Sequence, residues 1–165
     1  MRIAVSDANI FIDLLEVEAV AHLFSLDMEV HTTDRVLLEL YPEQEQELLK
    51  YHTRGDLILH QITDDDKAAI NAANYNPGLS DADKSVLFLA GRVEAMVLTG
   101  DDLVRKNCHQ SAIEIHGILW LLDQFVEQGI LETSQVHRLL ERLMTINTRL
   151  PVEHCTTRLN KWKTE

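Results

Sequence analysis

The segment Ile3-Ala4-Val5-Ser6-Asp7 decides the predicted fold, because a short β-prone apolar run ends there in a carboxylate. Glu29 to Thr32, Ala95 to Leu98 and Ile113-Glu114-Ile115 are runs of the same kind, and longer segments of helical period separate them. This alternation is typical of an α/β domain with a mainly parallel sheet. Leu57 to Ile62 is a further candidate strand, but its flanking residues do not show whether it joins the same sheet.

Caps and apolar stripes predict four helices along the chain. They begin at Asp34, Ser80, Gly117 and Thr133. Tyr41-Pro42 interrupts the first helix, Gly91 ends the second, and the third runs to Gly129. Residues 151–165 differ in composition from the rest and are expected to be a solvated tail or a short helix.

Length and composition predict a folded protein of one domain, because 165 residues with 45% hydrophobic content are enough to bury a core. The 27 acidic residues exceed the 15 basic ones, which gives a net charge of −12. That charge argues against a simple nucleic-acid binder, although bound cations can invert the local charge of an acidic nuclease site. Two cysteines offer no disulfide framework or thiolate zinc site. Without an apolar span or leader, we expect a cytoplasmic protein that does not enter a membrane.

Two carboxylates follow predicted strands at positions where parallel sheets bind ligands. Asp7 comes directly after the first strand, and Asp101 follows the Ala95 to Leu98 strand by Thr99-Gly100 only. Groups just past the carboxyl ends of parallel strands line the ligand crevice, so both side chains are expected in one cleft. The alternative for each is that it caps the helix or turn that follows.

Asp83 and Glu39 are the other candidate acids. Asp83 lies three residues after Ser80, so it either completes a capping box or serves as a metal ligand held by the first helical turn. Asp81 competes with Asp83 for either role. Glu39 flanks the apolar face of the helix that Asp34 starts, where a solvated glutamate is the usual case.

Taken in chain order, four segments resemble the acidic motifs of PIN-domain nucleases. They are Ser6-Asp7-Ala8-Asn9-Ile10-Phe11-Ile12, Val36-Leu37-Leu38-Glu39, Leu79-Ser80-Asp81-Ala82-Asp83 with Leu89-Ala90, and Leu98-Thr99-Gly100-Asp101 with Arg105. The resemblance implies a three-layer PIN-like nuclease domain with a mainly parallel central sheet over residues 1–150, followed by the tail. A VapC-like toxin or a related PIN branch is the subtype that it implies.

The resemblance also implies a divalent-metal site, with catalytic and metal-binding roles for Asp7, Glu39, Asp83 and Asp101. Carboxylates crowded into one crevice repel each other and take up protons unless a cation compensates them. Oxygen-only ligands favour Mg²⁺ or Mn²⁺ over zinc. Such a metal would lower the pKa of a water and orient it in line with the scissile phosphodiester.

Six further residues are expected around these acids. The supporting residues are Asn9, Thr99, Asp81 and Asp102, of which Asn9 resembles the small polar residue that orients the first Asp of the family. Asp81 and Asp102 double the third and fourth acids, so the assignment between neighbours stays open. Arg105 and Lys106 lie one turn beyond Asp101 and can contact substrate phosphate, with a solvated helical face as the alternative.

The expected function is therefore that of a metal-dependent endoribonuclease that hydrolyses RNA phosphodiester bonds. A toxin of a toxin–antitoxin pair is its narrower form, with an antitoxin protein or a homodimer as further partners. The first rival is a noncatalytic PIN-like interaction module, which the net charge of −12 favours. The second rival, a haloacid-dehalogenase-like phosphatase, needs a second Asp two residues after its nucleophile, and position 9 is Asn.

Overall fold

A single parallel sheet forms the centre of the molecule. The computed structural model describes residues 1–163, and its strands follow the order β3-β2-β1-β4-β5. The strands are β1 Arg2–Ser6, β2 Met28–Thr33, β3 Leu57–His60, β4 Met96–Leu98 and β5 Ile115–His116. Every neighbouring pair is parallel, and Val5 is in register with both His31 and Val97. The predicted parallel α/β fold is confirmed, and the additional candidate strand joins the same sheet as its edge.

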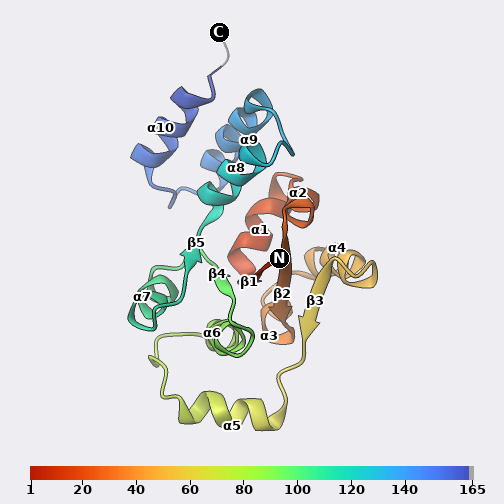
Figure 1. Cartoon of the computed structure of the whole chain (residues 1–165), viewed down its shortest axis with the longest axis vertical. Helices are drawn as coiled ribbons and strands as arrows, with labels where there is room; N and C mark the ends of the chain where they lie inside the picture. The colour runs from red at the N-terminus through yellow and green to blue at the C-terminus, as the bar shows by residue number, and fades with distance from the viewer. Residues whose placement is uncertain (164–165) are drawn as a thin grey trace.

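Helices cover both faces of this sheet. They are α1 Ala8–Glu16, α2 Val20–Ser25, α3 Asp34–Leu37, α4 Pro42–Thr53, α5 Asp64–Ala72, α6 Asp81–Val93, α7 Asp102–Gln110, α8 Ile118–Glu127, α9 Thr133–Ile146 and α10 Val152–Lys161. The connections β1 to β2 and β3 to β4 run in opposite directions along the sheet, and right-handed crossovers then place α1 and α6 on opposite faces. Figure 1 shows α8, α9 and α10 together at one end and α5 at the other.

The strand order reverses between β1 and β4, which are neighbours at the centre of the sheet. In open parallel sheets the ligand crevice lies outside the carboxyl ends of the two strands that flank such a reversal. The backbone N–H of Asp7 donates to the carbonyl oxygen of Leu98 at 3.0 Å, so the two strand ends are joined there. The topology therefore puts residues 7 and 99–101 at one crevice.

Two predicted boundaries are wrong by a few residues. The last strand was expected at residues 113–115, but Ala112 adopts a φ of 56° and Ile113 bonds back to Cys108, which delays β5 to Ile115. Helix α6 does not end at Gly91 but continues to Val93, with Glu94 as its left-handed C-cap at a φ of 54°. One glycine inside a helix costs only about 1 kcal/mol relative to alanine, and the packing of Val93 against the core offsets that cost.

Glu39 does not lie inside a helix as expected. Helix α3 covers only Asp34–Leu37, and its N-cap is Thr33, whose hydroxyl accepts the N–H of Val36 at 3.2 Å. Pro42 disfavours the helical conformation at the residue before it, and Tyr41 is accordingly extended, with a ψ of 154°. The chain therefore turns between α3 and α4, and Glu39 lies in that turn.

The C-terminal segment is a packed helix rather than a solvated tail. Cys155 and Trp162 are 0% and 2% exposed, and with Leu159 they form an apolar stripe along α10 and its C-cap. The guanidinium of Arg158 makes two hydrogen bonds to the Asp123 carboxylate of α8, at 2.7 and 2.9 Å. Both cysteines are free and buried. Within residues 1–163, no helix is long and apolar enough to cross a membrane.

Candidate active site

Asp7 is a buried carboxylate at the carboxyl end of β1. It is 4% exposed, and one of its oxygens accepts the backbone N–H of Ile10 at 3.1 Å, so Asp7 is also the N-cap of α1. The hydroxyl of Thr99 donates to its other oxygen. Among residues 1–163, no Lys, Arg or His forms an ion pair with this carboxylate.

Burial raises the pKa of Asp7 from its ordinary value of 3.8 to about 7. The hydrogen bonds from Thr99 and Ile10 oppose this rise, whereas the nearby carboxylates of Asp83 and Asp101 add to it. Those two acids therefore lie close enough to interact electrostatically with Asp7. Burial and like-charge neighbours both make ionisation of Asp7 unfavourable, and a bound cation would offset both effects.

Asp101 follows β4 and is tied to Asp7 through Thr99. The Oγ1 atom of Thr99 accepts the backbone N–H of Asp101 at 3.0 Å while its proton goes to Asp7. One oxygen of Asp101, Oδ1, accepts the N–H groups of Leu103 and Val104 at 2.9 and 3.0 Å, so Asp101 caps α7. Asp101 can therefore cap α7 and still bind a ligand in the crevice, because its second oxygen has no hydrogen bond among the described residues.

Asp83 and Glu39 are joined through Ser80. The expected capping box is present, since the N–H of Asp83 donates to the Ser80 hydroxyl at 3.0 Å and Asp83 Oδ2 accepts the N–H of Ser80 at 3.1 Å. The Ser80 hydroxyl also donates to Oε1 of Glu39 at 3.2 Å. Burial raises the pKa of Glu39, the hydrogen bond from Ser80 opposes this, and the charge of Asp83 raises it further.

The four candidate acids thus form two neighbouring pairs, Asp7 with Asp101 and Asp83 with Glu39. Their oxygens do not converge on one common position. Within the described part of the chain, no group of three or more His, Cys, Asp or Glu side chains is close enough to hold a metal ion. The donor set itself fits a hard divalent cation, because it consists of carboxylates alone. Asp83, Asp101 and Glu39 each keep one oxygen free of hydrogen bonds to residues 1–163.

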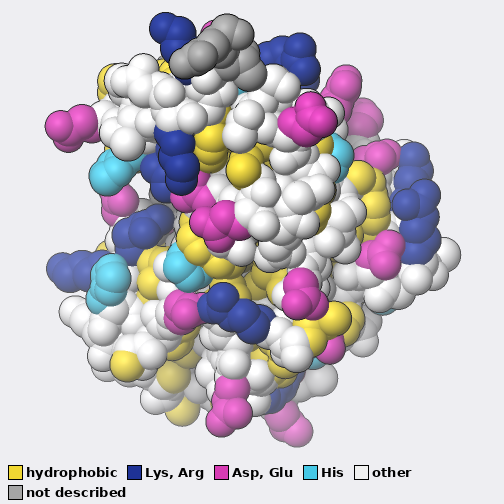
Figure 2. Space-filling model, turned by 45° about the horizontal axis from the view of Figure 1, so that its top comes forward, with side chains coloured by type: hydrophobic (Ala, Val, Ile, Leu, Met, Phe, Trp, Pro, Cys, Tyr) yellow, Lys and Arg dark blue, Asp and Glu magenta, His cyan; other side chains and the backbone are white. Residues whose placement is uncertain are grey.

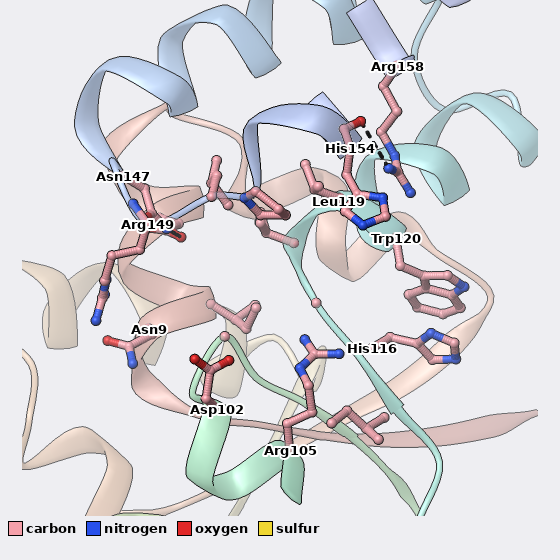
Figure 3. A pocket seen from close by; sticks show the side chains of 18 residues that line it. Asn9, Asp102, Arg105, His116, Leu119, Trp120, Asn147, Arg149, His154 and Arg158 are labelled. Carbon is pink, nitrogen blue, oxygen red and sulfur yellow. Dashed lines mark hydrogen bonds between the residues drawn. The ribbon is translucent and has the colours of Figure 1, made fainter. Parts of the chain in front are cut away.

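The supporting residues fall into different surroundings. Asp81 is exposed and lines a separate pocket beside Lys67 and Lys84. Asp102 is exposed at the start of α7 and lines the same cavity as Asn9 (Figure 3). Asn9 was expected to orient Asp7, but the hydrogen bonds to Asp7 come from Thr99 and from Ile10. Lys106 is exposed, whereas Arg105 is half-buried and reaches the carbonyl of Thr99 at 3.4 Å.

Sequence reasoning missed a buried hydroxyl pair behind these acids. The hydroxyls of Thr33 and Ser85 lie 2.7 Å apart, and the Ser85 hydroxyl donates to the carbonyl of Ala82 at 2.7 Å. Thr33 also caps α3, so this pair ties the helix before Glu39 to the helix that carries Asp83. The sequence offered one indication of this pair: Thr33 directly follows a β-prone run, where polar side chains line the carboxyl end of a parallel sheet.

The C-terminal segment supplies further residues that the sequence did not suggest. Asn147, Arg149, His154 and Arg158 line the cavity that also contains Asn9 and Asp102. In the sequence they lie more than 40 residues beyond Asp101, so only the packing of α9 and α10 against the remainder of the domain brings them there.

Comparison with known proteins agrees with this architecture. No curated protein matches the sequence. A protein-family model for the PIN domain matches residues 3–164, which is nearly the entire chain and includes α10. PIN domains are generally nucleases that act on nucleic acid with divalent metals. Because the match includes residues of all five strands and all four candidate acids, the chain belongs to the PIN-domain family.

Proposed function

We propose that this protein is an endoribonuclease that depends on Mg²⁺ or Mn²⁺ and that uses Asp7, Glu39, Asp83 and Asp101. The observation that carries the proposal is the Asp7 carboxylate, which is 4% exposed, has two acidic neighbours and has no ion-pair partner within residues 1–163. A buried carboxylate in such surroundings is costly unless a cation is bound nearby. Its position at the strand reversal is where this type of sheet binds ligands.

The residues around Asp7 support this assignment by orienting it. The Thr99 hydroxyl and the Ile10 N–H hold its carboxylate from two sides, and the same Thr99 oxygen positions the backbone of Asp101. Asp7, Asp83, Asp101 and Glu39 would hold the cation through their oxygens. When bound, it would supply charge stabilisation for the phosphodiester and activation of the attacking water. No nucleophilic side chain is needed for this chemistry.

Cleavage of labelled single-stranded RNA by the purified protein tests the proposal. Cleavage is expected with Mg²⁺ or Mn²⁺, and it should stop with EDTA and in Asp7→Asn. Asp81→Asn is the matched control, because Asp81 is exposed and lines a different pocket. Cleavage that persists in EDTA or in Asp7→Asn would overturn the assignment. A single-stranded DNA of the same sequence separates ribonuclease from general nuclease activity.

A noncatalytic PIN-like interaction module is the second candidate, and two observations favour it. They are the net charge of −12 and the absence, within residues 1–163, of acids close enough to hold a metal together. Calorimetric titration with Mn²⁺ separates the two functions. The nuclease requires metal binding that Asp7→Asn abolishes, whereas the interaction module requires neither metal binding nor cleavage.

A toxin role is the narrower form of the proposal and rests on the resemblance to toxin-like PIN branches. Expression of the chain in a bacterial host would then arrest growth, and the Asp7→Asn variant, produced at the same level, would not. Growth arrest by both variants would show that the toxicity does not come from this site. Co-expression of the neighbouring reading frame would identify an antitoxin by restored growth.

A further inference from the structure

The cavity that Asn9 and Asp102 line extends along the side of β5. Its volume is about 590 Å³, and we call it the C-terminal pocket. Its walls are the start of α1, the start of α7, residues 115–120 and the segment 147–158 (Figure 3). Asn9 and Asp102 lie on the wall nearest the acids, two residues after Asp7 and one after Asp101. A strand of substrate that crosses the acids can therefore continue into this pocket.

The C-terminal pocket is rich in cationic side chains although the chain is acidic. Arg105, Arg149 and Arg158 line it, three of the 15 Lys and Arg residues of a chain with a net charge of −12. Figure 2 shows Lys, Arg and His side chains on the left of the view, with Asp and Glu side chains between them, on the side where Figure 1 has α7 and α10. The acidic side chains in the same walls are Asp13 and Asp102.

Two of these arginines form no ion pair within the described residues, although the charge of Arg149 acts on the nearby Asp13 carboxylate and opposes the rise of its pKa. Arg158 is engaged, because its guanidinium binds the Asp123 carboxylate at 2.7 and 2.9 Å. Within the described residues, the Arg105 side chain donates one hydrogen bond, to the carbonyl oxygen of Thr99 at 3.4 Å, and the Arg149 side chain donates none. In Figure 3 the Arg105 side chain comes from α7 and the Arg149 side chain from the segment after α9, and Asp102 lies between them in the view.

An aromatic pair forms another wall of the C-terminal pocket. The rings of His116 and Trp120 are stacked, with centroids 3.9 Å apart and planes inclined by 13°. Both side chains are half-buried, and burial lowers the pKa of His116, which favours its neutral form. The Arg2 guanidinium lies over the Trp120 ring, 6.0 Å from its centroid, so the open face of this stack is that of His116. A planar base can extend the stack there, because bases bind aromatic side chains face to face.

We propose that the C-terminal pocket binds the nucleotide of single-stranded RNA that adjoins the scissile phosphodiester. Arg105 and Arg149 take its phosphate, and the His116–Trp120 pair takes its base. Arginines with an aromatic platform are the combination that binds unpaired nucleotides. Paired bases cannot reach the platform because they are stacked inside a duplex. This inference rests on the proposed nuclease function and specifies which substrate form the enzyme accepts.

The position of Arg149 does not depend on its own side chain. The amide of Asn147 donates to the Asp13 carboxylate of α1 at 2.9 Å, and Oδ1 of Asn147 accepts the N–H of Arg149 at 3.1 Å. These bonds hold the segment against α1 through the backbone of Arg149. Arg149→Gln therefore removes the cation and leaves the wall of the pocket in place.

Tryptophan fluorescence gives a direct binding test. The chain has two Trp residues, and Trp162 is 2% exposed, so a stacked base would quench Trp120 alone. The full-length Asp7→Asn protein is titrated in EDTA with adenosine 5′-monophosphate, with adenosine and inorganic phosphate as separate arms. Adenosine 5′-monophosphate is expected to quench fluorescence at a lower concentration than adenosine does. Inorganic phosphate is expected to displace the bound nucleotide and so to reverse the quench.

Variants in the same Asp7→Asn background locate the binding site. Arg149→Gln and Arg105→Gln are each expected to weaken nucleotide binding by roughly fivefold to tenfold. Arg138→Gln is the matched control, because Arg138 is an exposed arginine of α9 that lines a different pocket. Trp120→Phe should remove the quench. No quench at millimolar nucleotide, a quench that survives Trp120→Phe, or equal effects of Arg149→Gln and Arg138→Gln would each overturn the proposal.

The experiments distinguish an error in the nucleotide-binding proposal from an error in the nuclease proposal. Nucleotide binding without metal-dependent cleavage would remove the proposed function and leave a nucleotide site. Cleavage whose KM for single-stranded RNA is unchanged in Arg149→Gln would keep the function and remove the pocket. Binding of an acidic peptide in preference to the nucleotide would show that the cations serve a protein partner instead.

Discussion

Asp7 illustrates how one side chain serves local structure and site chemistry together. Its carboxylate caps α1 through the N–H of Ile10, yet burial and the charges of Asp83 and Asp101 raise its pKa to about 7. The metal-free protein therefore contains a group that costs free energy whenever it is ionised. The capping and metal-binding interpretations of this residue, which are alternatives in the sequence, are compatible in the structure.

The pKa of Asp7 predicts how stability depends on pH. The pKa is raised in the folded state, so the contribution of Asp7 to the free energy of unfolding of the metal-free protein should fall as pH rises from about 4 to about 7. Asp7→Asn should remove this dependence and raise stability at pH 8 by roughly 1–4 kcal/mol. Urea unfolding in EDTA at pH 4 and pH 8 measures the effect. A variant less stable than the wild type at pH 8 would contradict the prediction.

The doubled acids after β4 predict a difference between Asp101 and Asp102. Asp101→Asn keeps a good N-cap for α7 while it removes the charge, so stability should change little. The variant should nevertheless lose Mn²⁺ binding and cleavage. Asp102→Asn, at an exposed position, should change the Mn²⁺ affinity by less than about fivefold. Equal losses of Mn²⁺ binding in the two variants, measured by calorimetric titration, would show that the assignment is wrong.

At the scale of elements, buried polar bonds hold the helices that carry the outer acids. Thr33 ends β2, caps α3 and contacts Ser85 of α6 at 2.7 Å, with both side chains 0% exposed. The relative position of Glu39 and Asp83 thus depends on a hydroxyl pair rather than on the acids themselves.

Loss of this hydroxyl should therefore destabilise the domain. Thr33→Val keeps the volume but leaves the N–H of Val36 and the hydroxyl of Ser85 with one partner fewer each. A decrease of roughly 1–3 kcal/mol in the free energy of unfolding is expected. Thr33→Ser, which retains the hydroxyl, is the control and should be closer to the wild type. Equal losses in the two variants would contradict the prediction that the hydroxyl contributes more to stability than the γ-methyl group.

At the scale of the whole molecule, α10 is part of the domain. Its Trp162 is 2% exposed, its Arg158 pairs with Asp123 of α8, and the family match extends to residue 164. A domain that ended at residue 150 would expose this packed surface and lose one wall of the C-terminal pocket.

Substitution of Trp162 tests this dependence. Trp162→Ala should reduce the free energy of unfolding by roughly 3–5 kcal/mol, as large-to-small changes in a core do. Lys161→Ala, one residue earlier and exposed, is the matched control and should change it by less than about 0.5 kcal/mol. Urea unfolding compares the two, and similar small losses would show that residues 151–163 lie outside the cooperative unit.

The sequence by itself determined the fold class, the order of the strands along the chain and the identity of the candidate acids. These depend on local patterns: β-prone apolar runs, helical stripes, caps, and acids placed directly after strands. The Ser80–Asp83 capping box is a further example, since both partners lie within one helical turn.

Only the tertiary structure decided which distant residues share a site. Burial of Asp7, its contact with Thr99 and the Thr33–Ser85 pair depend on strand order, which no local pattern encodes. Arg149 and Arg158 reach the C-terminal pocket because the hydrophobic stripes of α9 and α10 bury themselves against the domain. Burial of those stripes is driven by the free energy of removing apolar surface from water, which is non-directional, so the sequence pattern does not specify the partner surface.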